Sequence, residues 1–68
     1  MNIKLGRCRL TILLKERKKT ARWLAERTGM SEQRISDYSN NRKSMSLVTA
    51  KSISLALDCQ IDDLYSWE

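Results

Sequence analysis

The stretch of sequence that decides the fold runs from Thr20 to Arg42 and reads TARWLAERTGMSEQRISDYSNNR. It holds two short segments with apolar residues at helical spacing, separated by Gly29. Thr20 and Ser31 stand just before these segments, where a side-chain hydroxyl accepts a hydrogen bond from an unpaired first-turn amide. Gly29 suits the left-handed conformation that ends many helices. The stretch therefore predicts helices over about 21–28 and 32–39, joined by a tight turn.

Two short helices joined by a turn of about three residues form the helix-turn-helix unit, whose second helix enters the DNA major groove. The intervening side chains fit this geometry. Ala25 is small enough for the helices to cross closely, and Met30 and Ile35 fill the angle between them. Ser31 begins the second helix, whose partially positive amino end then faces the DNA. We predict a helix-turn-helix unit over about residues 20–39.

The rest of the chain predicts further helices on both sides of this unit. One runs from Gly6 to Lys18, one begins after Ser46, and a last short helix runs from Ile61 to about Tyr65. Proline is absent, glycine occurs twice, and no alternating strand pattern is present. We expect an all-α fold, a compact bundle of five short helices forming a single domain over 1–68. The predicted inward positions are Leu10, Leu13, Leu14, Leu24, Ala25, Ile35, Tyr38, Leu47, Ala50, Ile53, Ala56, Leu57, Ile61 and Leu64.

Charge is distributed unevenly along the chain. The net charge is +5, but residues 1–43 carry twelve of the 13 Lys and Arg and four of the eight Asp and Glu. Such polarity is expected where one face of a protein meets a polyanion. For the basic run between Lys15 and Lys19 a simpler explanation stays open, because cations are favoured at the carboxyl end of a helix.

Several classes of protein are excluded by composition. No apolar run reaches the roughly 20 residues of a membrane helix, and the amino terminus does not resemble a signal peptide, so we expect a cytoplasmic protein. There is no histidine, and Cys8 and Cys59 are too few for a zinc site, so we expect two small buried thiols, no metal and no cofactor. No nucleophile–base pair or phosphate-cradling glycine loop is present, so we expect no enzyme. The pattern offers no separate domain that could bind an effector, so we expect no small-molecule effector.

The run LAERTGMS, then Ile35, Asn40 and the basic pair Arg42-Lys43, resemble the helix-turn-helix family of phage repressors and Cro proteins. The resemblance spans about residues 7–65 and continues through SLVTAKSISLALDCQIDDLY, which is similar to the family's final two helices. It implies a lambda repressor-like DNA-binding domain and a sequence-specific transcriptional regulator, expected to be a repressor. Three positions depart from the family pattern. Ala21 replaces a phosphate-binding glutamine, Asn41 replaces a glycine and Met45 replaces a proline.

The resemblance and helical geometry together place candidate base contacts on the outward side of residues 32–39. These are Gln33, Ser36, Asp37 and Glu32. Gln33 can pair bidentately with adenine, and Ser36 is a permissive donor or acceptor. Glu32 and Asp37 either accept from cytosine amino groups or repel phosphate, and Glu32 alternatively serves the positive helix start.

Candidate phosphate contacts lie in the loop after this helix and at the start of the preceding one. They are Thr20, Arg22, Arg34, Asn40, Arg42, Lys43 and Ser44. The loop from Asn40 to Ser44 resembles the family's phosphate clamp, and the alternative is an ordinary polar turn. Arg34 is expected to reach a phosphate or a base near the groove edge.

The partner expected from this interpretation is double-stranded DNA, bound by a homodimer. Leu64, Tyr65 and Trp67 are the expected dimer interface, and the alternative is that they close the core of a monomer. Trp23 either packs under the first helix, with Arg27 stacked on it, or forms a contact surface. A different function also stays open. The acids of residues 32–39 and the missing glutamine favour a helix-turn-helix-fold interaction module, or an antitoxin-like partner with little DNA binding.

Overall fold

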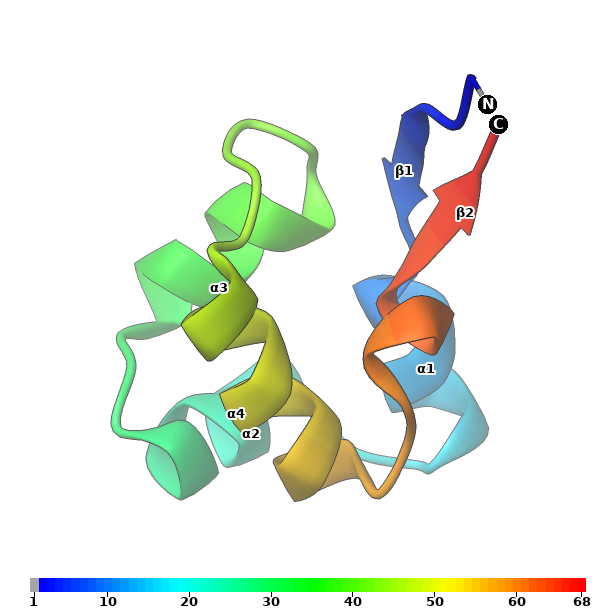
Figure 1. Cartoon of the computed structure of the whole chain (residues 1–68). Helices are drawn as coiled ribbons and strands as arrows, with labels where there is room; N and C mark the ends of the chain where they lie inside the picture. The colour runs from blue at the N-terminus through cyan, green and yellow to red at the C-terminus, as the bar shows by residue number, and fades with distance from the viewer. Residues whose placement is uncertain (1) are drawn as a thin grey trace.

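A computed structural model describes residues 2–68, which form four α-helices, one 3-10 helix and two short strands. In chain order these are β1 (Leu5–Cys8), α1 (Leu10–Glu16), α2 (Ala21–Thr28), α3 (Glu32–Ser39), α4 (Leu47–Leu57), η1 (Ile61–Leu64) and β2 (Tyr65–Trp67). The helices pack into one body, and the paired strands project from one end of it, where Lys4 lies beside Glu68 (Figure 1).

The helix-turn-helix unit forms as predicted, because its start and stop signals are local. Thr20 Oγ1 accepts a hydrogen bond from the backbone N–H of Trp23 at 3.1 Å, and Ser31 Oγ accepts from Arg34 at 3.2 Å. Gly29 ends α2 in the left-handed region, with φ of 75°. Ser46 caps α4 in the same way, accepting from the backbone N–H of Thr49 at 3.1 Å. These side chains satisfy amides that the helix itself leaves unpaired.

The core draws on every helix and on β2. Its buried members are Leu10, Leu13, Leu14, Leu24, Ala25, Ile35, Tyr38, Ala50, Ile53, Leu57, Leu64 and Tyr65. Most of the predicted inward positions are therefore confirmed. Ala56 and Ile61 are half-buried against this core, and Leu47 is the exception, with 76% of its surface exposed. It is the first residue of α4, where its side chain lies outside the contact that buries Ala50 and Ile53.

The prediction of a purely helical bundle with five helices is wrong at both ends of the chain. Residues 5–8 form a strand instead of the first turn of a helix, so α1 begins only at Leu10, and the last predicted helix is a 3-10 turn followed by a strand. β1 pairs antiparallel with β2, with Leu5 opposite Trp67 and Cys8 opposite Tyr65. The backbone N–H of Glu68 donates to the Lys4 carbonyl at 2.9 Å. This pairing joins the two ends of the chain, so no local pattern indicates it.

Gly6 is required by the close approach of the two strands. A Cβ atom at this position would lie 2.6 Å from the carbonyl oxygen of Ser66 and still closer to its Oγ. The register shifts at this point, and Ser66 Oγ accepts a hydrogen bond from the backbone N–H of Arg7 at 3.0 Å. A side chain larger than hydrogen would force the strands apart.

We therefore expect Gly6→Ala to destabilise the protein by about 1–3 kcal/mol, the usual effect of overpacking a close contact. Urea unfolding followed by circular dichroism measures this difference. Arg7→Ala, an exposed neighbour in the same strand, is the control and should unfold close to the parent. A Gly6→Ala chain with the parent's midpoint would contradict the close-approach argument.

Candidate nucleic-acid interface

Helix α3 is fixed to the body by two buried residues. Ile35 is completely buried and Tyr38 is 6% exposed, and both belong to the core. Tyr38 follows Ile35 by three residues, so the two side chains line one side of the helix. The opposite side is left for Gln33, Ser36 and Asp37.

Asp37 is the centre of a polar network on that outward side. Its Oδ1 accepts a hydrogen bond from Gln33 Nε2 at 3.1 Å and another from Arg42 Nε at 3.0 Å. Lys43 Nζ lies 3.8 Å from Oδ2. Candidate base contacts and candidate phosphate contacts thus meet at a single carboxylate.

Ser36 connects the same network to the end of the helix. Its Oγ accepts from Asn40 Nδ2 at 3.1 Å and from Arg42 Nη2 at 3.0 Å. Both acceptor positions of the hydroxyl are then filled, which leaves its O–H free to donate. Together, these side chains form what we term the α3 polar cluster. It consists of Gln33, Ser36, Asp37, Asn40, Arg42 and Lys43.

The charge of Asp37 is compensated within the cluster. The hydrogen bond from Arg42, with a second from Gln33, holds the pKa of the Asp37 carboxyl below its usual range. The carboxylate interaction is therefore present above the ordinary aspartate pKa and is lost only as pH falls through the lowered one. Two cations, Arg42 and Lys43, face this one carboxylate, so the cluster as a whole stays positive.

The basic loop after α3 is anchored to both strands. Asn41, in the left-handed region with φ of 60°, accepts a hydrogen bond at Oδ1 from the backbone N–H of Cys8 at 2.8 Å. At the other end of the loop, the backbone N–H of Met45 donates to the Tyr65 hydroxyl at 3.1 Å. Neither anchor could be predicted from the sequence, because nothing local marks the distant partners, Cys8 and Tyr65.

The remaining predicted contacts lie outside the α3 polar cluster. Arg22 is exposed and pairs with Glu26, with 3.3 Å between Nε and Oε1. Arg34 donates from Nη2 to the Tyr38 hydroxyl at 3.1 Å. Glu32 is exposed at the start of α3 and Ser44 is exposed in the loop, while the Thr20 hydroxyl caps α2.

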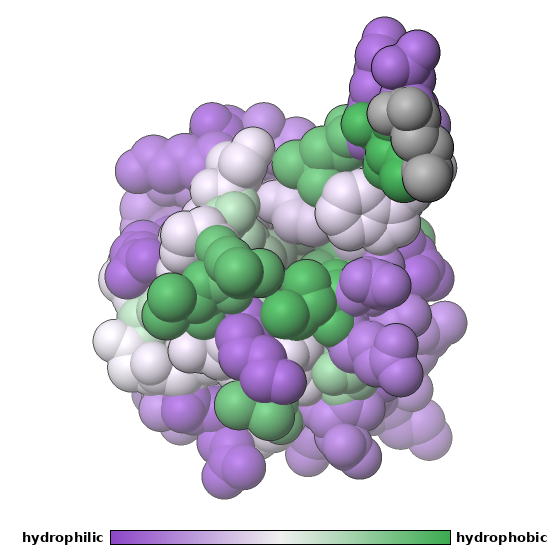
Figure 2. Space-filling view, viewed as in Figure 1, coloured by the Kyte–Doolittle hydropathy of each residue, from purple (hydrophilic) through white to green (hydrophobic). Residues whose placement is uncertain are grey.

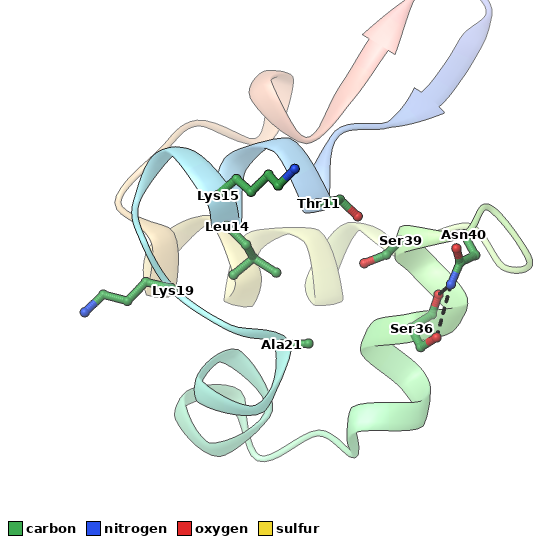
Figure 3. A pocket seen from close by; sticks show the side chains of 8 residues that line it. All are labelled: Thr11, Leu14, Lys15, Lys19, Ala21, Ser36, Ser39 and Asn40. Atoms are coloured by element: carbon green, nitrogen blue, oxygen red, sulfur yellow. Dashed lines mark hydrogen bonds between the residues drawn. The ribbon is translucent and has the colours of Figure 1, made fainter.

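A cleft of about 320 Å³ adjoins the cluster, between α1, the start of α2 and the end of α3. Its lining is Thr11, Leu14, Lys15, Lys19, Ala21, Ser36, Ser39 and Asn40. In Figure 3 the residues of α1 face those of α3 across the opening, and Asn40 bonds to Ser36 at its edge. Lys15 and Lys19 thus border the predicted interface, as the polyanion interpretation of the basic half expects.

Trp23 is half-buried and lies between two cations. Its ring packs against the core, with Lys19 Nζ at 5.0 Å and Arg27 Cζ at 5.8 Å from the ring centroid. The predicted stacking of Arg27 is confirmed.

Cys8 and Cys59 are half-buried free thiols packed against the core, and burial raises the pKa of both.

The carboxyl-terminal residues divide between core and surface. Leu64 is completely buried and Tyr65 is 8% exposed, so both belong to the core of a single chain, as the alternative interpretation held. Leu64 is fully enclosed by the chain, whereas Tyr65 also lines the apolar groove beside Trp67. Trp67 remains 50% exposed, with its Nε1 donating to the Asp62 carbonyl at 3.0 Å.

An apolar groove of about 230 Å³ lies beside Trp67. Its lining consists of Leu5, Met45, Ser46, Leu47, Ala50, Ile61, Tyr65 and Trp67. Figure 2 shows apolar side chains gathered on this face of the molecule, interrupted by polar ones. Val48, next to Leu47, is 78% exposed.

Among residues 2–68 no helix is long and apolar enough to cross a membrane, and no group of potential ligands could hold a metal ion.

Comparison with known proteins agrees with this geometry. The pattern of the Cro/C1-type HTH DNA-binding domain matches residues 9–68. The chain is similar to two SPbeta prophage-derived uncharacterized HTH-type transcriptional regulators of Bacillus subtilis (strain 168). It is 38% identical to YopS, covering 100% of this chain and 93% of the relative. It is 42% identical to YotL, covering 87% of this chain and 75% of the relative.

A solved structure has a similar fold over nearly the whole chain. It is the crystal structure of a Bacteroides fragilis protein described as DNA-binding, with a TM-score of 0.82 and 29% sequence identity. The alignment covers 96% of this chain and 100% of that one. The likeness therefore extends beyond the helix-turn-helix unit to the strands and the last helix.

Proposed function

Because the chain belongs to the Cro/C1-type helix-turn-helix DNA-binding family, we propose that it represses transcription by inserting α3 into the major groove of double-stranded DNA. The observation that carries this proposal is the α3 polar cluster, which joins base-reading side chains to a basic loop on one outward surface. The acids of α3 favoured an interaction module without DNA binding. For Asp37 that argument loses its force, because Arg42 and Lys43 compensate its charge.

In this proposal, the exposed side chains of α3 contact the base edges. Gln33 presents an amide that matches the N7 acceptor and N6 donor of adenine. Ser36, with its acceptor positions filled from within the chain, acts as a donor. Glu32 is exposed and can accept from the amino group of cytosine.

The anchored loop and the start of α2 bind the phosphates in this proposal. Asn40, Arg42, Lys43 and Ser44 contact one stretch of backbone in this proposal. Thr20, Arg22 and Arg34 contact neighbouring phosphates, and the cleft with Lys15 and Lys19 extends the positive surface. Such contacts set position and affinity but do not carry sequence information.

A homodimer supplies the remaining specificity, since one recognition helix reads too few base pairs to find one site in a genome. We place the dimer contact at the groove beside Trp67. Exposed apolar residues are concentrated there, with Leu5 at 46% and Leu47 at 76% exposure. A two-fold dimer repeats the α3 contacts on a near-palindromic operator.

Replacing Lys43 with alanine should weaken binding to all DNA sequences alike and reduce the log–log salt slope by about 1. The reason is that a phosphate contact releases counterions but reads no base. Fluorescence anisotropy over a series of salt concentrations measures both effects. Arg42→Ala should act in the same direction, with an added change because it also uncovers Asp37. Lys51→Ala, an exposed cation on α4, is the control, and equal slopes in Lys43→Ala and the parent would contradict the loop's role.

Replacing Gln33 with alanine should reduce binding to the preferred site by about 1–3 kcal/mol and binding to random DNA much less. The preferred site is first obtained by selection from random duplexes. Gln60→Ala removes the chain's other glutamine, outside α3, and should leave the difference between sites intact. If Gln33→Ala loses equal affinity for both DNAs, Gln33 does not read bases. If selection recovers no preferred site, the interaction-module function gains.

Sedimentation equilibrium with operator DNA should find two chains per near-palindromic site. Trp67→Ala and Leu47→Ser should each weaken this assembly about tenfold or more, because central apolar residues dominate interface energies. Leu55→Ser is the control, since Leu55 is 68% exposed on α4 but does not line the groove. A parent chain that binds single asymmetric half-sites as a monomer would overturn the dimer proposal.

A further inference from the structure

We propose that Asp37 is a positioning residue that fixes the orientation of the Gln33 amide and thereby makes the protein prefer adenine over guanine. The proposal rests on the proposed function, in which Gln33 reads a base. It assigns Asp37 a role different from direct base contact, because its carboxylate already has partners within the chain.

The geometry begins with spacing along α3. Asp37 follows Gln33 by four residues, so the two side chains lie on the same side of the helix. Gln33 Nε2 is 3.1 Å from Asp37 Oδ1. A carboxylate only accepts hydrogen bonds, so the amide must turn its nitrogen, not its oxygen, toward Asp37. One of the two N–H groups of Gln33 is thus committed, and the other N–H and Oε1 remain for a ligand.

Asp37 is itself held in place, which makes it a suitable support. Arg42 Nε donates to the same Oδ1 at 3.0 Å, and Arg42 Nη2 donates to Ser36 Oγ at 3.0 Å. Only 13% of the Asp37 side chain is exposed, against 55% for Arg42. The carboxylate is therefore enclosed by its partners, and the Gln33 amide faces a fixed acceptor.

This arrangement bears directly on the choice of base. Adenine presents an acceptor, N7, beside a donor, the N6 amino group, whereas guanine presents two acceptors, N7 and O6. A free glutamine amide can offer both of its N–H groups to guanine, or one N–H and its oxygen to adenine. With one N–H bound to Asp37, Gln33 retains the pattern for adenine and loses the second donor for guanine.

The test compares Asp37→Asn with the parent on matched duplexes. One duplex carries the preferred site, and the other has the adenine read by Gln33 replaced by guanine, with its complement. That position is identified as the one at which Gln33→Ala loses discrimination. An asparagine at position 37 can donate as well as accept, so the Gln33 amide can turn either its nitrogen or its oxygen toward residue 37. We expect the adenine-to-guanine ratio to fall severalfold, mainly because the guanine duplex binds more tightly.

Glu16→Gln is the matched control. It removes one negative charge at an exposed position of α1, a residue with no proposed DNA contact. It should strengthen binding to both duplexes alike, through reduced repulsion of phosphate, and leave the ratio unchanged. If Asp37→Asn behaves in the same way as Glu16→Gln, Asp37 acts only through its charge and the proposal is overturned.

A measurement without DNA tests the hydrogen bond itself. The chain has two glutamines, so the side-chain amide resonances of Gln33 and Gln60 can be assigned by substitution in nitrogen-15 NMR spectra. In the parent, one Gln33 amide proton should be shifted downfield by the carboxylate, and in Asp37→Asn and Asp37→Ala that shift should disappear while Gln60 stays unchanged. Gln33 resonances that do not respond to either substitution would overturn the proposal. If Gln33→Ala loses discrimination and Asp37→Asn keeps it, only the orienting role fails, whereas no discrimination by the parent defeats base reading as a whole.

Discussion

The close crossing of α2 and α3 is the constraint on which the rest of the molecule depends. Leu24 and Ile35 are completely buried at this crossing, and Ala25 is 6% exposed. The chain reaches it through Gly29, in a left-handed conformation that costs other L-residues about 1–2 kcal/mol. Because Ile35 fixes the rotation of α3 about its own axis, it also decides that Gln33, Ser36 and Asp37 face outward. The interface is therefore a consequence of core packing one turn away.

Local signals explain why the helical part of the fold could be predicted from sequence. Thr20, Ser31 and Ser46 each accept a bond from an amide three residues later, so the information lies within a single turn. The strands could not be predicted in this way. Residues 5–8 contain no alternation of their own, and they are extended only because residues 65–67 lie beside them. Gly6, which looked like the start of a helix, is explained by Ser66, sixty positions later.

In the candidate site too, features set by local sequence could be predicted and features set by distant contacts could not. Helical periodicity was enough to select the outward residues of α3, since it requires only the position of Ile35. It was not enough to say what Asp37 does, because its partner Arg42 arrives from a loop. The path of that loop is set by two hydrogen bonds, one donated by the Cys8 N–H to Asn41 Oδ1 and one by the Met45 N–H to the Tyr65 hydroxyl. Tyr65 shows the same limit, because nothing in the sequence indicates that its hydroxyl supports the loop.

The strands and the interface are physically connected through that loop. The Tyr65 hydroxyl holds the backbone of Met45, and Met45 also lines the groove in which Trp67 stands. A partner chain that occupied this groove would therefore press on the same short segment that carries Arg42 and Lys43. By linkage, a contact that orders the loop for DNA must be strengthened in turn when DNA orders it. In the proposed homodimer, we therefore expect dimer formation and phosphate binding to be coupled through this one anchored segment.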